Sequence, residues 1–378
     1  MTDELSQPDR VEGAPHPRET LHLIGQGAAE AGFLEAYNSG RLHHGWLITG
    51  PRGVGKATLA WRIARFLLAT EDADAGGGLF GDAPEVPQNL DIAPDHPVSR
   101  RLLAGSDPGL FHITRTLNEK TGRMRDQIVA EDVRRLARFL GLSAADGGRR
   151  VVIIDSADEM NVQAANALLK MLEEPPARTT LLLISHQPTR LLPTIRSRCR
   201  ELRLPPLGPD DMAAALVQAG VETDDADAVA LAALSGGSVG EAVRLSNLGG
   251  LEMYRELTQL FASLPQLDRV RALKLANAAA TRGAEDRLDL LIGLFDLLMA
   301  RLARTGSLGT PPEPEAAPGE AEMLMRLAPD PAQGRAWADC AQVAGTRARH
   351  GRAVNLDPAA LVLDTIIKIQ KTTAGTAR

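Results

Sequence analysis

The feature that most constrains the fold is a glycine-rich loop at residues 50–58, with the sequence Gly-Pro-Arg-Gly-Val-Gly-Lys-Ala-Thr. It follows a short apolar run at residues 46–49 and opens a segment in which Leu59, Ile63 and Leu67 recur with helical spacing. In this context, glycines let backbone N–H groups surround a phosphate, and the positive end of the helix points at the same anion. The residues predicted to form this phosphate-binding loop are Gly50, Gly53, Gly55, Lys56 and Thr58.

One position in the loop departs from the pattern of an active nucleotide site. The residue after the lysine normally carries the hydroxyl that ligates magnesium, and here it is Ala57. Thr58 stands one residue later, and one residue turns a helical side chain by about 100°. Two interpretations follow: a loop that folds but binds nucleotide weakly, and a functional nucleotide-binding loop.

Further apolar runs indicate that the loop belongs to an α/β domain. The runs at residues 110–113, 151–154 and 181–184 alternate with helical patterns, which predicts a parallel sheet covered on both faces. In one of these patterns Val133, Leu136, Ala137 and Leu140 share a helix face. Between residues 70 and 108, glycines and prolines predict an excursion without regular elements.

An acidic residue ends the third apolar run. Asp155 is predicted to support magnesium through water at the edge of the sheet that faces the loop. Ser156 follows it, at the position where an active ATPase of this kind carries a glutamate that polarises the attacking water. Asp158 and Glu159 are predicted to cap the next helix.

Composition excludes several classes of protein. The two cysteines, Cys199 and Cys340, exclude a disulfide framework and a four-cysteine zinc site, and His96 with His112 makes a poor zinc cage, so no metal is predicted there. A net charge of −6 predicts no broad cationic surface for DNA. The basic residues Lys120, Arg123 and Arg125 are left without an assigned role.

No membrane segment or export signal is predicted, so the expected location is the cytoplasm. The amino terminus is acidic and polar, whereas a secretory signal is basic and then apolar. The longest apolar stretch, at residues 288–302, is shorter than a span and is predicted to be a buried helix.

An ordered set of motifs follows the acidic strand. Residues 166–176 read Asn-Ala-Leu-Leu-Lys-Met-Leu-Glu-Glu-Pro-Pro, then come Ser185-His186, and then residues 192–199, Leu-Pro-Thr-Ile-Arg-Ser-Arg-Cys. This set closely resembles the bacterial clamp-loader subunits of the AAA+ class, across residues 15–204. Residues 41–44 and, more weakly, 355–358 also resemble that family.

The resemblance implies a role for Arg198. In the family, the arginine of the Ser-Arg-Cys motif touches the γ-phosphate of ATP bound to a neighbouring subunit; the alternative is that Arg198 caps a helix or pairs with an acidic neighbour. Ser185 matches a polar residue that senses the γ-phosphate, although a serine at a strand end is also ordinary in a turn. The family's second sensor arginine has no counterpart at residues 237–241. Together with Ala57 and Ser156, this favours a subunit that does not hydrolyse ATP.

The resemblance also implies an architecture of three domains. These are an AAA+ P-loop core with a parallel sheet at residues 1–206, a small helical lid at 207–248 and an all-α collar at 249–378. Residues 310–320 are expected to form a solvated loop in the collar. Asp357 and Pro358 look like the N-cap and first-turn proline of the last helix, where Ile366, Ile367 and Ile369 are expected to pack.

The implied function is that of a stator in the clamp loader of the DNA polymerase III holoenzyme, a nucleotidyltransferase complex. Its partners would be motor subunits of the gamma/tau type and the delta subunit, with the sliding clamp and primed DNA reached through the complex. ATP or ADP with magnesium would bind weakly or without hydrolysis, and no zinc is expected. The alternative functions are a motor ATPase and a P-loop kinase, and the Ser-Arg-Cys block argues against the kinase.

Overall fold

The computed structural model describes residues 8–70, 86–118, 121–141, 148–281, 283 and 285–375. Several features of the sequence lie outside these residues: most of the acidic amino terminus, the glycines at 76–78, Pro84 and Lys120.

A five-stranded parallel sheet forms the centre of the amino-terminal part. Its strand order is β2-β3-β4-β1-β5. The four predicted apolar runs are strands, and the fifth strand, with the sequence Arg-Glu-Leu-Arg, was not predicted. The bounds are β1 Gly45–Thr49, β2 Leu110–Ile113, β3 Arg150–Asp155, β4 Thr179–Ser185 and β5 Arg200–Arg203.

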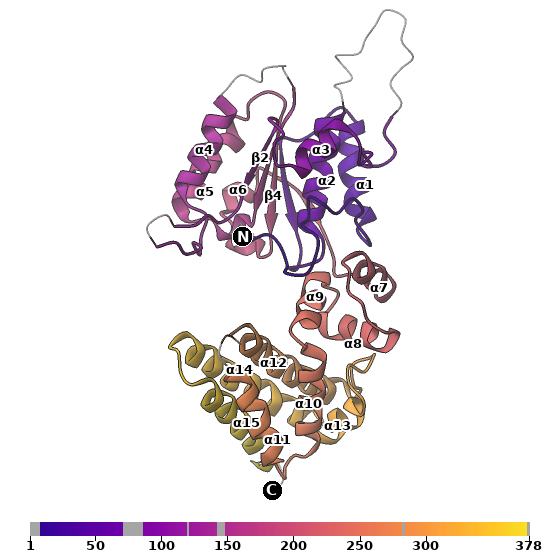
Figure 1. Cartoon of the computed structure of the whole chain (residues 1–378), viewed down its shortest axis with the longest axis vertical. Coiled ribbons are helices and arrows are strands. Elements are labelled where there is room, and N and C mark those ends of the chain that lie inside the picture. The colour runs from indigo at the N-terminus through magenta and orange to yellow at the C-terminus, as the bar shows by residue number, and fades with distance from the viewer. Residues whose placement is uncertain are drawn as a thin grey trace, which may run out of the picture. The chain divides into compact units, whose positions relative to one another are not determined.

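Helices cover both faces of this sheet. Helices α1, α2 and α3 lie on one side and α4 and α5 on the other (Figure 1). Side chains of the central strands alternate between these layers, and those at Val152, Ile154, Leu181 and Leu183 belong to the core under α4 and α5. The bounds are α1 Gly27–Asn38, α2 Lys56–Ala69, α3 Pro97–Leu103, α4 Ala130–Gly141, α5 Val162–Glu173 and α6 Pro193–Arg196, with 3₁₀ helices η1 Ala157–Glu159 and η2 Pro188–Arg190.

The expectation of an irregular excursion at residues 70–108 is wrong for its second half. Helix α3 forms there, with Val98 and Leu102 buried. The His96 side chain accepts a hydrogen bond from the Val98 N–H and caps the helix, so this imidazole has a structural role. The prolines that suggested a break instead precede the helix and occupy its first turn, where proline is tolerated.

The predicted face of α4 is largely correct. Val133, Leu136 and Leu140 are buried, whereas Ala137 is exposed. The residue that caps α5 is Asn161, whose side chain accepts a hydrogen bond from the Ala164 N–H at 2.8 Å. Asp158 and Glu159 therefore do not have the predicted capping role.

The remainder of the described chain is helical, as predicted. Contacts divide the protein into two compact units, Met1–Ala215 with Ser238–Gly240, and Leu216–Gly237 with Glu241–Arg378. The expected boundaries at residues 206 and 248 stay a prediction. The bounds are α7 Pro209–Gln218, α8 Asp225–Ser235, α9 Val239–Asn247, α10 Gly250–Ala262, α11 Arg269–Ala279, α12 Glu285–Leu308, α13 Glu320–Leu327, α14 Pro331–Ala353 and α15 Pro358–Gly375.

In the helical unit, α12 packs along α14, and α15 packs against α11 and α14. Asp357 caps α15 by accepting the Ala360 N–H at 2.8 Å, as predicted. Ile366 and Ile369 are buried, but Ile367 is exposed. Within the described ranges no single helix is long and apolar enough to cross a bilayer, and only α8 and α9 together, with a bend of 119° between them, pass that test.

The segment at residues 310–320 is a loop up to the start of α13, and Glu313, Pro314 and Glu315 are exposed as predicted, but other parts of it are buried. Ala316 and Ala317 are buried, and Glu320 is completely buried. The Glu320 carboxylate accepts hydrogen bonds from Arg301 Nε at 2.6 Å, from the Ala316 N–H at 2.7 Å and from the Tyr254 hydroxyl. One buried carboxylate thus fixes the end of this segment against α10 and α12.

Candidate functional site

The register of the sheet brings the predicted polar residues to one edge. Thr49 at the end of β1 is paired with Ser185 at the end of β4, and Asp155 at the end of β3 is paired with Ile184. Because the strands are parallel, their carboxyl ends meet where the phosphate loop begins. Asp155, Ser185 and the loop are therefore neighbours, as the sequence predicted.

The phosphate loop has the backbone that its glycines permit. Gly53 and Gly55 have φ angles of +72° and +97°, in a region that other residues rarely adopt. A side chain at Gly53 would also collide with the start of α9, since a Cβ there would lie 2.7 Å from the Gly240 nitrogen. The Gly240 N–H donates to the Gly53 carbonyl at 3.2 Å, so residues 238–240 pack directly on the loop.

Lys56 is turned back onto the loop itself. Its ammonium group donates to the Gly50 carbonyl at 2.7 Å and also to the Pro51 carbonyl. The side chain is 3% exposed, and burial lowers its pKa to about 8, against the opposing effect of Asp155. The lysine that would contact outer phosphates therefore satisfies carbonyl groups of its own loop.

Asp155 is buried beside this lysine. Burial, together with the nearby carboxylate of Asp9, raises the pKa of Asp155 to about 7, although Lys56 acts in the opposite direction. The Asp9 side chain comes from the amino-terminal segment, and its position was not predicted.

Ser156 contacts His186, a histidine to which the sequence analysis assigned no role. Its hydroxyl lies 2.9 Å from Nε2 of His186, and burial lowers the pKa of His186 to about 4. Asp158 accepts the backbone N–H groups of His186 and Gln187 at 3.0 and 3.2 Å. Asp158 thus holds the turn after β4 in place, and no carboxylate occupies the position of Ser156.

The remaining loop residues add little for a metal. Ala57 has no ligating atom, and Thr58 is half-buried on the following position of the helix. Ser185 is fully buried, and its hydroxyl has no hydrogen-bond partner among the described residues. The backbone cradle for a phosphate is therefore retained, whereas the hydroxyl ligand that magnesium needs is missing.

Arg198 lies near the amino ends of the strands, at the end of the sheet opposite the phosphate loop. The next strand begins at Arg200, which is paired with Trp46 near the amino end of β1. The phosphate loop starts after the carboxyl end of the same strand, about 13 Å away at the rise of a β-strand. The Arg198 guanidinium is partly exposed and contacts Glu173 Oε1 at 2.8 Å and the Thr194 carbonyl at 3.0 Å.

The adjacent residue, Cys199, is a packing residue. Burial raises the pKa of its thiol to about 12, so the thiolate is scarce at neutral pH.

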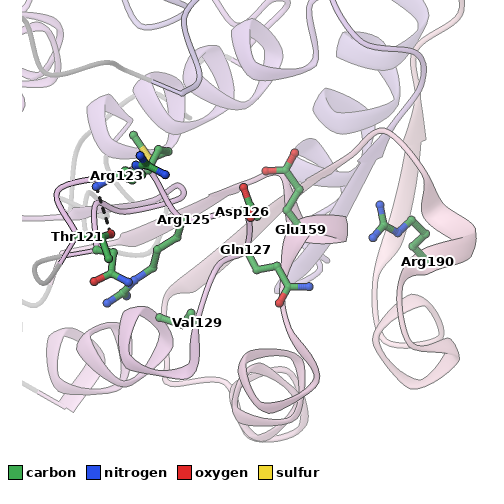
Figure 2. Close-up of a pocket in the computed structure, with 10 residues that line it drawn as sticks. Thr121, Arg123, Arg125, Asp126, Gln127, Val129, Glu159 and Arg190 are labelled. Atoms are coloured by element: carbon green, nitrogen blue, oxygen red, sulfur yellow. Dashed lines mark hydrogen bonds between the residues drawn. The ribbon is translucent and has the colours of Figure 1, made fainter. Parts of the chain in front are cut away.

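A cavity of about 840 Å³ lies beside the turn after β2 (Figure 2). Its lining consists of Asn118, Thr121, Arg123, Met124, Arg125, Asp126, Gln127, Val129, Glu159 and Arg190. Arg123 and Arg125, two members of the predicted basic cluster, belong to this lining. Glu159 links the cavity to the phosphate loop, since it contacts Arg52 at 2.7 Å and Arg115 at 2.9 Å. Glu159 therefore pairs with two arginines, of which Arg52 belongs to the phosphate loop, and does not act as a helix cap.

Sequence reasoning assigned no role beside the phosphate loop to Gln26, Asp9 or His112. Gln26 is buried and donates to the carbonyls of Val54 and Pro205, which ties the loop to the segment after β5. Asp9 and His112 lie close to Asp155. Only the polar character of these residues was visible in the sequence, because each is remote in the chain from the residues that it meets.

The strand order, the phosphate loop after β1 and the acidic end of β3 together define a P-loop protein of the AAA+ class, an α/β core followed by helices. The family model described as "DNA polymerase III, delta subunit" matches residues 25–208.

Two delta-prime subunits with known names agree with this match. The delta-prime subunit of DNA polymerase III from Pseudomonas aeruginosa is 39% identical over 217 residues, which are 57% of this chain and 60% of that protein. The delta-prime subunit from Escherichia coli is 31% identical over 246 residues, which are 65% of this chain and 67% of that protein. A solved structure, a DNA polymerase III gamma-subunit-related protein of Thermotoga maritima, covers 90% of this chain and 99% of that one, with 17% identity and a TM-score of 0.39.

The chain belongs to the family of DNA polymerase III delta-prime subunits. Its AAA+ class and its family are those that the ordered motifs at residues 166–199 indicated.

Proposed function

We propose that the chain acts as a stator in the clamp loader, where it supplies Arg198 to ATP bound by a neighbouring motor subunit. The observation that carries this proposal is the placement of Arg198 at the amino edge of the sheet, remote from the phosphate loop of its own chain. A guanidinium in that place is available to a neighbour and not to its own nucleotide site.

The surroundings of Arg198 suit such a transfer. The Glu173 carboxylate that holds it is 49% exposed, and exposed ion pairs of this kind contribute about 0–1 kcal/mol. A phosphoryl group with developing charge is a stronger partner for the planar guanidinium. The contact with Glu173 therefore orients Arg198 and is readily exchanged.

The chain's own nucleotide site has the features of a site without turnover. Ala57 offers no magnesium ligand, and Ser156 has no carboxylate to polarise water. ATP or ADP is proposed to bind weakly through the loop backbone and to remain unhydrolysed. Gly50, Gly53 and Gly55 would surround the phosphates, and Lys56 would have to leave the Gly50 carbonyl to reach them.

The proposed partners are motor subunits of the gamma/tau type and the delta subunit, with the sliding clamp and primed DNA reached through the assembled loader. The helical unit would supply the contacts of the ring. A motor role for this chain, the alternative function, is opposed by Ala57 and by the engagement of Ser156 with His186.

The test is the steady-state ATPase rate of the reconstituted loader with clamp and primed DNA. We compare the native chain with Arg198→Ala and with Arg196→Ala, which removes an exposed arginine two residues earlier, at the end of α6. An arginine finger is worth about 10³ to 10⁵ in rate at its own site, so Arg198→Ala should abolish turnover at the adjacent motor subunit. Arg196→Ala should leave it intact.

Assembly is measured in the same samples by size-exclusion chromatography, and the isolated chain serves as the blank. Hydrolysis by the isolated chain would contradict the proposal, as would an unchanged rate for Arg198→Ala in a fully assembled loader.

A further inference from the structure

A second polar cluster lies beside the phosphate loop and shares Asp155 with the predicted nucleotide site. It consists of Asp9 from the amino-terminal segment, His112 of β2 and Asp155 at the end of β3. One ligand atom from each side chain lies within 4.8 Å of the other two. Three separate segments of the chain thus bring three candidate metal ligands together.

The imidazole of His112 is aimed into this cluster without a hydrogen-bond partner. Its Nε2 atom is inaccessible to solvent and has no such partner among the described residues. The nearest carboxylate oxygen, Asp9 Oδ2, is 3.6 Å away, which is too far for a hydrogen bond. A buried polar nitrogen without a partner is costly, and a bound metal ion satisfies it.

The orientation of Asp9 is fixed from its other side. The Arg18 N–H donates to Nδ1 of His16 at 3.1 Å, so the proton of a neutral His16 is on Nε2. That Nε2 lies 2.9 Å from Asp9 Oδ2 and donates to it. A carboxylate held by an outer hydrogen bond, with lone pairs left over, is the usual arrangement of a metal ligand.

We propose that Asp9, His112 and Asp155 bind a divalent transition-metal ion of the zinc class in the absence of nucleotide. One imidazole and two carboxylates suit Zn²⁺ and its neighbours, and three protein ligands leave a position for water. Mg²⁺ prefers oxygen ligands alone, which separates this site from the magnesium that accompanies a nucleotide. The sequence excluded zinc because thiolates were missing, but these ligands come from distant segments.

The proposed metal site is independent of the stator role, because Arg198 lies near the amino ends of the strands, away from Asp155. The Arg198→Ala variant should therefore bind the metal as the native chain does. Failure of either proposal leaves the other standing.

The experiment is a calorimetric titration of Zn²⁺ into the isolated full chain, after treatment with a chelator and without nucleotide. We expect saturation at one ion per chain and a micromolar or lower Kd that millimolar Mg²⁺ does not displace. His112→Gln and Asp9→Asn should each weaken binding by about tenfold or more. His350→Gln, which removes an exposed histidine of α14, is the matched control and should bind normally.

A second readout does not depend on the folding of those variants. The ring of Trp61 meets that of His112 edge-on, with centroids 5.2 Å apart. Co²⁺ at the site should quench Trp61 fluorescence in the native chain, and Trp61→Phe should lose the saturable quenching. Absence of saturable binding would overturn the proposal and point to a proton shared by the two carboxyl groups. Binding that survives both His112→Gln and Asp9→Asn would overturn it too.

Discussion

Removal of the negative charge of Glu320 should destabilise the helical unit strongly. The carboxylate is fully buried and accepts four hydrogen bonds, two of them from Arg301 and the others from Tyr254 and the Ala316 N–H. Glu320→Gln keeps the shape but puts an amide N–H₂ against these donors and leaves Arg301 buried without its partner. Loss of one member of a buried ion pair costs about 3–5 kcal/mol in the free energy of unfolding.

The assay is native-state hydrogen exchange read on peptides from α12 and α13, which isolates the unfolding of this part of the chain. Asp364→Asn is the matched control. Asp364 pairs with Arg347 and Lys368 on the surface of the same unit, with side chains 37%, 62% and 27% exposed, so its loss should cost about 0–1 kcal/mol.

The double variant Arg301→Met, Glu320→Leu tests the cause of the effect. Replacing both charges by apolar groups should recover most of the loss, because no buried charge is left unpaired. A cost for Glu320→Gln no larger than that for Asp364→Asn would refute the reasoning, since it would mean that Glu320 is hydrated in solution.

Three further predictions concern the α/β unit. The pKa of Lys56 is lowered from its ordinary value of 10.5 to about 8 in the folded chain. The stabilising contribution of Lys56 is therefore complete above pH 10.5 and is lost as the pH falls through 8. In urea titrations the unfolding free energy of the native chain should rise by about 3 kcal/mol between pH 7 and pH 11, relative to that of Lys56→Met. Gly53→Ala forces a Cβ to 2.7 Å from the Gly240 nitrogen at a φ of +72° and should lower the thermal midpoint, whereas Gly122→Ala, at a φ of +64° with open space, should lower it less. Burial raises the pKa of Cys199 to about 12, so iodoacetamide at pH 8 should alkylate it at least about 100-fold more slowly in the folded chain than in urea; equal rates would contradict its burial.

The sheet shows where sequence patterns succeed and where they stop. The four central runs were predictable because strands buried on both faces are continuously apolar. Strand β5 was missed because only Leu202 of its four residues is buried, as suits a strand at the edge of a sheet. Helix α3 was hidden by flanking prolines, although His96 and Pro97 form an ordinary helix start.

The candidate site was predictable in its chemistry but not in its connections. The loop glycines, Lys56 and Asp155 follow from local spacing and from the rule that parallel strands end together. The contacts of Glu173 with Arg198 and of Asp9 with His112 join segments far apart in the chain, and no local pattern encodes them. That Arg198 lies away from its own loop depends on the register of β5 against β1.

The most direct test of the proposed stator role is a single-turnover measurement of ATP hydrolysis at the motor subunit that is proposed to neighbour this chain. Arg198→Lys keeps the positive charge and removes the planar fork. The account predicts that this variant slows hydrolysis at that site at least about 100-fold while ATP binding and assembly stay unchanged. An unchanged rate at the neighbouring site, in a loader that contains the variant, would contradict the claim that Arg198 acts in trans.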